Sequence, residues 1–184
     1  DVHFLVGGTQ TNTTVIAHFL RPYQGVIAAD TGHINVHETG AIESCGHKVL
    51  TVESADGKIT PEQIQTVIDF HTDEHMVMPK LVYISNSTEV GTQYSKAELI
   101  SLREYCKKNG LYLFLDGARL GSALTSDVND LTMADIASLC DMFYIGGTKN
   151  GALFGEALVI MNDHLKDDFR YLIKQRGAML AKGF

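Results

Sequence analysis

Lys149 is the residue of this sequence whose surroundings point most directly to covalent chemistry. It stands in Gly146-Gly147-Thr148-Lys149-Asn150-Gly151, immediately after an apolar run over residues 142–145. Its neighbours are small and uncharged, so an amine held there and partly withdrawn from water would have a lowered pKa. Such an amine could form a Schiff base with a carbonyl compound. An ordinary surface lysine is the alternative interpretation.

Asp116 is the second candidate, because it ends the apolar run over residues 112–115 and is expected to be buried. A buried carboxylate needs a cationic partner, and a protonated pyridine nitrogen is one group that would serve. Two other interpretations stay open. Asp116 could cap the turn that follows it, or it could pair with Arg119.

Gly7-Gly8-Thr9 could form a phosphate cradle. Glycines let a ligand approach the backbone closely, and the N-terminus of a following helix favours an anion. The segment is neither a P-loop nor a GxGxxG motif. The alternative is a plain glycine turn in which Thr9 is the N-cap of the helix.

His33, His37 and Glu38 form a third polar group. Two histidines four residues apart raise the question of zinc, but the pattern is not HExxH and has no obvious third ligand, so no metal site is predicted. We expect His33 either to stack on a planar ligand or to be a structural histidine. Glu38 is either an acid/base group or a charge in the first turn of a helix.

The elements that must position these residues are short apolar runs alternating with amphipathic stretches. Helix starts are predicted at the capping boxes Thr60-Pro61-Glu62-Gln63 and Ser95-Lys96-Ala97-Glu98, with a stop at Asn109-Gly110. Asp163 is expected to cap a last helix. Buried strands are predicted over residues 3–6, 26–29, 48–52, 81–85, 112–115 and 142–145, with a seventh over 157–161 that pairs with its predecessor.

This alternation predicts a three-layer α/β domain with a mostly parallel, seven-stranded sheet. Ligands of such sheets bind outside the carboxyl ends of the strands. Five strand ends carry polar or Gly-rich segments, which should therefore share one edge. These segments begin at Gly7, Asp30, Asn86, Asp116 and Gly146.

Taken together, these motifs resemble those of the threonine aldolase / β-eliminating lyase family, pyridoxal-phosphate enzymes of fold type I. The matching segments are Gly7-Gly8-Thr9-Gln10-Thr11-Asn12, His33-Ile34-x-x-x-Glu38-x-Gly40, Asp116-Gly117-Ala118-Arg119 and Gly147-Thr148-Lys149. The likeness runs over nearly the whole length. Cys45-Gly46-His47-Lys48-Val49 and Lys174-Gln175-Arg176-Gly177 are similar to the low-specificity threonine aldolase branch.

The resemblance implies that pyridoxal 5'-phosphate is the cofactor and gives several residues a role in binding it. Lys149 would form the Schiff base, Asp116 would keep the pyridine nitrogen protonated, and His33 would stack on the ring. The phosphate would be held by Gly8 and Thr9, with help from Thr148 and from Lys182 toward a neighbouring subunit.

The resemblance also implies cleavage of the Cα–Cβ bond of a β-hydroxy amino acid, giving glycine and acetaldehyde from threonine or allo-threonine. Arg119 would grip the carboxylate of the substrate in a bidentate way. A base would take the hydroxyl proton, and His33, Glu38 or a water between them are the candidates.

One departure from the family pattern keeps other activities open. Familiar threonine aldolases carry a histidine near the end of the fourth strand, whereas this segment reads Asn86-Ser87-Thr88-Glu89. An amino acid β-eliminating lyase and an aminotransferase of the same fold are therefore alternatives. A catalytically silent truncated subunit is a third.

Composition fits this interpretation and argues against other classes. The 184 residues carry a net charge of −7, which disfavours nucleic acid and anionic membranes as partners, and no apolar run is long enough for a membrane span. The three cysteines are widely spaced, so we expect a reducing, cytoplasmic compartment.

The length and the first residues give one further expectation. The chain starts without methionine and runs directly into a strand. We therefore expect residues 1–184 to be the large, cofactor-binding domain of a longer chain, without its N-terminal arm and its C-terminal small domain. The family implies a homo-oligomer, a dimer of dimers.

Overall fold

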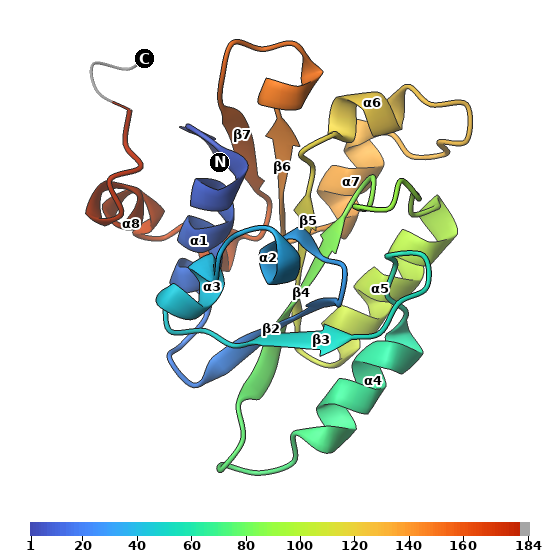
Figure 1. The fold of residues 1–184 in the computed structure, drawn as a ribbon, viewed down its shortest axis with the longest axis vertical. Coiled ribbons are helices and arrows are strands. Elements are labelled where there is room, and N and C mark those ends of the chain that lie inside the picture. Colours follow the sequence, from blue (N-terminus) through green and yellow to red (C-terminus); the bar gives the residue numbers. More distant parts are fainter. Residues whose placement is uncertain (181–184) are drawn as a thin grey trace.

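The computed structural model describes residues 1–180, whose seven strands form one sheet between layers of helices (Figure 1). The strand order is β1-β7-β6-β5-β4-β2-β3. β7 is antiparallel to both of its neighbours, and the other adjacent pairs are parallel. The predicted α/β fold is confirmed. The strands are β1 (Val2–Leu5), β2 (Gln24–Ala29), β3 (Val49–Val52), β4 (Met78–Ser85), β5 (Tyr112–Asp116), β6 (Met142–Gly146) and β7 (Glu156–Ile160).

Each predicted strand is present, with ends shifted by at most three residues. The helices of the described range include several short ones that the sequence patterns did not indicate. They are α1 (Gly8–Phe19), α2 (His33–Val36), α3 (Ala41–Ser44), α4 (Pro61–Phe70), α5 (Lys96–Lys108), α6 (Leu120–Leu124), α7 (Met133–Leu139) and α8 (Phe169–Gln175), with 3-10 turns η1 (Thr148–Asn150) and η2 (Asp163–Leu165).

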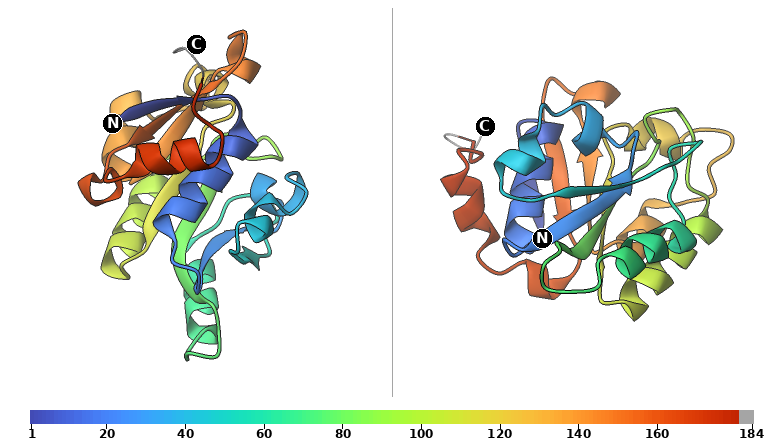
Figure 2. Two further views of the ribbon diagram at one scale, coloured as in Figure 1. Left: turned by 90° about the vertical axis from the view of Figure 1, so that its left-hand side faces the viewer. Right: turned by 60° about the horizontal axis from the view of Figure 1, so that its bottom comes forward.

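The two faces of the sheet are covered by different helices (Figure 2). Side chains alternate between faces along a strand, so Leu81 and Tyr83 of β4 pack in the core under α1 and α8, and Val82 and Ile84 pack under α4 and α5. Both cores hold fully buried side chains. The central strands are therefore covered on both sides, as a parallel sheet requires.

The two predicted capping boxes start α4 and α5. The Thr60 side chain accepts from the backbone N–H of Gln63, and the Ser95 side chain accepts from that of Glu98. A third box starts α7 at Thr132. Its partner at the third helical position is an aspartate rather than the more usual glutamate or glutamine, which explains why the pattern was missed.

The prediction for Asp163 is wrong. The side chain of Asn162 takes the capping role by accepting from the N–H of His164, and Asp163–Leu165 forms only the single turn η2. Helix α8 begins at Phe169, after Asp168 adopts a φ of 59°. This left-handed residue separates the two helical pieces, so one cap cannot serve both.

None of the helices within residues 1–180 combines the length and the apolar character that crossing a membrane would require.

Candidate active site

A polar cavity of about 340 Å³ lies at the carboxyl edge of the sheet, toward which the arrows of β4 and β6 point in Figure 1. Its walls come from segments that follow β1, β2, β4, β5 and β6 and from the start of β7. The predicted meeting of strand ends at one edge is thus present. The lining residues are Val6, Gly7, Gly8, Thr9, His33, Ser85, Ser87, Glu89, Asp116, Ala118, Arg119, Tyr144, Thr148, Lys149 and Glu156.

Two glycines let the turn after Asp116 pack against the end of β6. A Cβ on Gly117 would lie 1.9 Å from the carbonyl oxygen of Tyr144, and one on Gly146 would lie 2.3 Å from that of Ala118. The Gly146 N–H donates to the Gly117 carbonyl at 2.8 Å. This close approach fixes the Asp116 carboxylate at the floor of the cavity.

Asp116 is buried and accepts four hydrogen bonds. Its Oδ1 accepts from the Tyr144 hydroxyl at 2.5 Å and from the Ala118 N–H at 3.0 Å. Its Oδ2 accepts from the Tyr83 hydroxyl at 2.5 Å and from Asn12 Nδ2 at 3.3 Å. The carboxylate therefore does cap the turn that follows it. The alternative of pairing with Arg119 is not present, since the ion pairs within residues 1–180 do not include these two groups.

Tyr83 and Tyr144 keep their protons in this setting. Burial is the main cause that raises the pKa of both hydroxyls, and the nearby Asp116 charge raises it further. Both are therefore hydrogen-bond donors to Asp116 at any ordinary pH. Sequence reasoning missed them because a tyrosine in an apolar strand also fits a core position. No local signal distinguished them, because only the fold brings their rings to Phe114 of β5 and their hydroxyls to Asp116.

His33, Glu38 and Asn12 form a chain that ends at Asp116. His33 Nδ1 lies 2.9 Å from Glu38 Oε1, and the same oxygen accepts from Asn12 Nδ2 at 2.7 Å. The side chain of His33 is 31% exposed and that of Glu38 is 0% exposed. The hydrogen bond to Glu38 raises the pKa of His33, against the lowering effect of burial.

The structure rules out one of the two interpretations of Glu38, a charge in the first turn of a helix. The residue is not in the first turn of a helix, because α2 ends at Val36 and α3 begins at Ala41. Glu38 instead lies buried beneath His33, outside the lining of the cavity. Asn12 was part of a quoted motif but had no predicted role, because only the fold brings it to Glu38 and Asp116.

Helix α1 points its N-terminus at the cavity. Gly7 is the N-cap, its helix has no side-chain cap, and the first turn contains no acidic residue. The alternative in which Thr9 is the N-cap is therefore wrong, and Gly8 and Thr9 are the first two helical residues. A Cβ on Gly8 would come within 3.0 Å of the Tyr144 hydroxyl. The free N–H groups of this turn could bind an anion by donating hydrogen bonds to it.

Lys149 lines the cavity but is exposed, so the expected partial withdrawal of its amine from water is not present. The reason is local. Lys149 lies on the single turn η1, outside the sheet, and the left-handed Gly151 ends that turn. Asn150 anchors the loop, because its Nδ2 donates to the Gly146 carbonyl at 2.7 Å and its Oδ1 accepts from the Ser122 N–H at 3.2 Å.

Two further carboxylates face the cavity without a role predicted from the sequence, Glu89 and Glu156. Glu156 accepts from the Gly147 N–H at 3.0 Å, and burial raises its pKa. Glu89 Oε1 accepts from the Ser85 hydroxyl at 2.7 Å and from the His33 N–H at 3.0 Å. Glu89 stood in the polar segment after the fourth strand, which was the available signal.

Arg119 and Thr148 also lie at the cavity, and both are exposed. Lys182, the remaining candidate, lies outside the described residues. His33 and His37 have ring centroids 5.5 Å apart. No group of three or more His, Cys, Asp or Glu side chains in residues 1–180 is placed to hold a metal ion.

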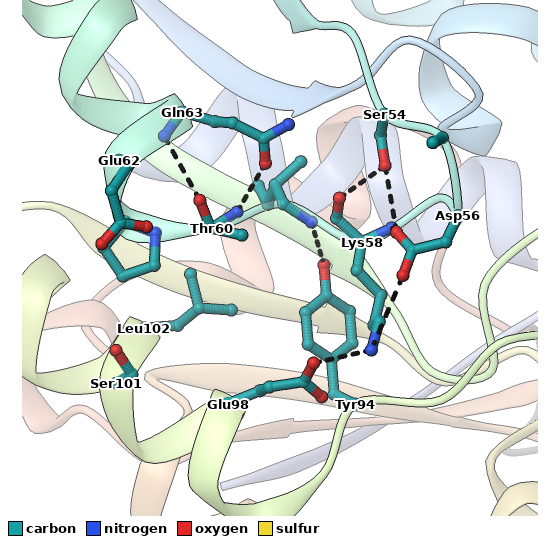
Figure 3. A pocket seen from close by; sticks show the side chains of 13 residues that line it. Ser54, Asp56, Lys58, Thr60, Glu62, Gln63, Tyr94, Glu98, Ser101 and Leu102 are labelled. Atoms are coloured by element: carbon teal, nitrogen blue, oxygen red, sulfur yellow. Dashed lines mark hydrogen bonds and ion pairs between the residues drawn. The ribbon is translucent and has the colours of Figure 1, made fainter.

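A second cavity, of about 450 Å³, lies between α4 and α5 on the outer face of the domain (Figure 3). Several of its polar groups are paired with one another. Lys58 Nζ contacts Glu98 at 2.6 Å and Asp56 at 3.7 Å, and the Tyr94 hydroxyl accepts from the Ile59 N–H at 2.7 Å. Lys58, the cation of this cavity, is therefore already paired with two carboxylates.

The fold and the first cavity define a class of protein. It is a three-layer α/β domain in which a lysine, a buried aspartate and the open N-terminus of a helix meet at the carboxyl edge of the sheet. The model of the beta-eliminating lyase family matches residues 1–184. The chain belongs to this family, as its motifs predicted.

Individual relatives agree with this assignment. The chain is 39% identical to the low specificity L-threonine aldolase of Pseudomonas sp. (strain NCIMB 10558), over 99% of this chain and 53% of the relative. It is 62% identical to the threonine aldolase of Leishmania major, whose structure matches all of this chain and 54% of that one with a TM-score of 0.98. Aspartate aminotransferase from Thermus thermophilus, 17% identical over 96% of this chain and 45% of that one, shares the fold with a TM-score of 0.75. The chain thus spans about half the length of the relatives it matches.

Proposed function

We propose that residues 1–184 form the cofactor-binding large domain of a pyridoxal-phosphate-dependent lyase that cleaves the Cα–Cβ bond of threonine or allo-threonine to glycine and acetaldehyde. The observation that carries the proposal is the single cavity that Lys149, Asp116, His33 and the Gly8 end of α1 share. The relatives support the choice of reaction, since threonine aldolases are among the proteins to which the chain is most similar in sequence and structure.

The residues of the cavity fit pyridoxal 5'-phosphate. Asp116 is a buried carboxylate at the cavity that could face a protonated ring nitrogen. The uncapped turn at Gly8 and Thr9 could hold the phosphate, with the hydroxyl of Thr148 also at the cavity. When bound, this cofactor supplies a ring that withdraws electrons from the Cα of an attached amino acid.

Lys149 is the lysine of the cavity lining and is the amine to which we assign the covalent bond to the cofactor. Its exposure suits this role, because the amine must be reachable by both cofactor and substrate. Asn150 contributes by fixing the loop through its contacts with the Gly146 carbonyl and Ser122.

Arg119 is the cation we assign to the carboxylate of the substrate. Its guanidinium can bind a carboxylate through two parallel hydrogen bonds, which fixes orientation as well as position. Orientation matters because the bond to be broken must be held in one direction relative to the cofactor ring. Arg119 is the residue before α6, at the same edge as Lys149.

We assign His33 to the catalytic group of the site, with Glu38 as the residue that positions it. Glu38 holds the imidazole through Nδ1. The rest of the His33 ring is therefore left free to face the cavity. The hydrogen bond to Glu38 raises the pKa of His33 and so favours its protonated form. The homo-oligomeric state and the cytoplasmic location stay predictions.

The experiment is an amino acid panel containing threonine, allo-threonine and serine, with acetaldehyde, keto acid and ammonia measured after addition of pyridoxal 5'-phosphate. We expect acetaldehyde and glycine in equal amounts from threonine or allo-threonine. Keto acid with ammonia would instead indicate β-elimination. Transfer of the amino group to an added keto acid would indicate an aminotransferase.

Lys149→Ala tests the covalent assignment in the same protein. We expect this variant to lose the visible absorption band of the lysine-bound cofactor, the adduct trapped by borohydride reduction and the cleavage of threonine. Lys107→Ala, an exposed lysine in the last turn of α5, is the matched control and should keep all three. An unchanged spectrum in Lys149→Ala would contradict the assignment.

A further inference from the structure

Glu89 is a carboxylate of the cavity whose position is fixed from two sides. It follows β4, and its Oε1 accepts from the Ser85 hydroxyl at 2.7 Å and from the backbone N–H of His33 at 3.0 Å. These donors come from the end of one strand and the start of α2. They hold the Glu89 side chain at the cavity wall beside His33.

The second oxygen of Glu89 is available to a ligand. Oε2 makes no hydrogen bond with any group in residues 1–180, and it is not among the buried polar atoms of that range that lack a partner. Because Glu89 lines the cavity and is partly exposed, this oxygen can accept a hydrogen bond or a proton from a molecule bound there.

The other carboxylates of the region are committed elsewhere. Glu38 is fully buried, does not line the cavity and holds His33 and Asn12. Asp116 accepts four hydrogen bonds at the floor. Glu156 is buried and turned to the loop of Lys149, where it accepts from the Gly147 N–H.

The placement of Glu89 complements the two cations of the cavity. Arg119 and Lys149 belong to the segments after β5 and β6, whereas Ser85, Ser87 and Glu89 belong to the segment at the end of β4. If Arg119 binds the carboxylate of a β-hydroxy amino acid from the β5 side of the cavity, the β-carbon of that substrate can lie toward the wall formed by the end of β4. A carboxylate on that wall would be placed to accept from the β-hydroxyl.

We propose, as an inference that rests on the proposed function, that Glu89 is the base that takes the β-hydroxyl proton of the substrate. The O–H bond breaks, and its electron pair forms the C=O bond of the leaving aldehyde. The Cα–Cβ electron pair is left on Cα, which then takes up a proton to give glycine. The proton from the hydroxyl goes to the Glu89 carboxylate, which later releases it to water.

Glu89→Gln is the variant that tests this role. The amide oxygen of glutamine can still accept from Ser85 and His33, so the wall is retained, but an amide cannot take up the proton. General base catalysis typically contributes a factor of 10² to 10⁴. We expect threonine cleavage to fall by about 100-fold or more. Glu104→Gln, an exposed residue of α5, is the matched control.

Three further measurements on Glu89→Gln separate this role from a structural one. We expect unchanged uptake of pyridoxal 5'-phosphate by absorbance titration and unchanged affinity for glycine by the same method. We also expect unchanged exchange of the glycine α-proton with deuterated water, because glycine has no β-hydroxyl.

The possible outcomes are distinct. Cleavage at the parental rate in Glu89→Gln overturns the inference. Loss of cofactor uptake or of glycine exchange together with cleavage also overturns it, since Glu89 would then act by holding the site together. If the parent protein exchanges the glycine proton but cleaves neither threonine nor allo-threonine, the proposed function itself fails, and the inference fails with it.

Discussion

His33 and Glu38 form a hydrogen-bonded pair whose two members differ in their access to water. The imidazole is partly exposed at the cavity, and the carboxylate is fully buried. Asn12 joins this pair to Asp116 through a single amide nitrogen, 2.7 Å from one carboxylate and 3.3 Å from the other. The two carboxylates are thus spaced by a shared donor, which offsets their mutual repulsion.

The raised pKa of His33 gives a prediction about pH. Because its pKa is higher in the folded chain than its ordinary value of 6.5, the His33–Glu38 contact contributes stability that is complete below that value and is lost as pH rises through the folded pKa. Glu38→Gln should lower the pKa of His33, measured by NMR titration. The stability difference between the parent and this variant, measured by urea unfolding, should be larger at about pH 5.5 than at about pH 8.5.

The control for this prediction is Glu104→Gln, which removes an exposed carboxylate of α5. It should leave the titration of His33 unaltered. A His33 pKa that is the same in the parent and in Glu38→Gln would show that the contact does not set it.

Helices α4, α5 and α7 hold one face of the sheet, and all three begin at a reciprocal capping box. The cap satisfies backbone N–H groups that the first turn of a helix leaves without partners. In α5 the Glu98 side chain accepts a hydrogen bond from the Ser95 N–H at 2.7 Å and also forms an ion pair with Lys58. The cap therefore ties the helix start to the loop before α4, as Figure 3 shows for Lys58 and Glu98.

Ser95→Ala should destabilise the protein by about 1 kcal/mol, because it removes the acceptor for the Glu98 N–H. Ser101→Ala on the same helix is the matched control. Ser101 is exposed in the interior of α5, where alanine is the better helix former, so this change should be neutral or slightly stabilising. Urea unfolding of both variants measures the difference, and equal stabilities would contradict the assigned cap.

At the scale of the whole molecule, the two edges of the sheet have different tasks. Polar groups that can still bind a ligand gather at the carboxyl edge. At the opposite edge the polar groups around Asp141 are hydrogen-bonded to one another. There Asp141, just before β6, is buried and accepts from Arg103 at 2.8 Å, from the Leu113 N–H at 2.8 Å and from Asn162 at 2.9 Å. This network joins α5, β5 and the segment after β7.

Asp141→Ala should lower the free energy of unfolding by about 3 kcal/mol, because it leaves a partly buried arginine and a buried N–H without their acceptor. Asp127→Ala, an exposed aspartate after α6, is the control and should change stability little. Urea unfolding measures both. The Asp141→Ala protein that stays folded should bind pyridoxal 5'-phosphate with parental affinity. A weakened affinity would contradict the inference that the Asp141 network supports stability and not the cavity.

Local signals in the sequence determined much of the architecture. Short apolar runs marked each strand of the described sheet, two capping boxes marked the starts of α4 and α5, and polar segments after the runs predicted the edge at which the cavity lies. These features depend on neighbouring residues and on the periodicity of strands and helices, so they can be recognised without knowledge of the fold.

The tertiary structure alone decided which side chains face the cavity and which are closed off. Asn12 meets Asp116 across 104 residues of sequence, Tyr83 and Tyr144 reach the same carboxylate from two other strands, and Glu38 is buried while Glu89 is not. Exposure and long-range hydrogen bonds depend on the packing of distant segments, and no local pattern records that packing.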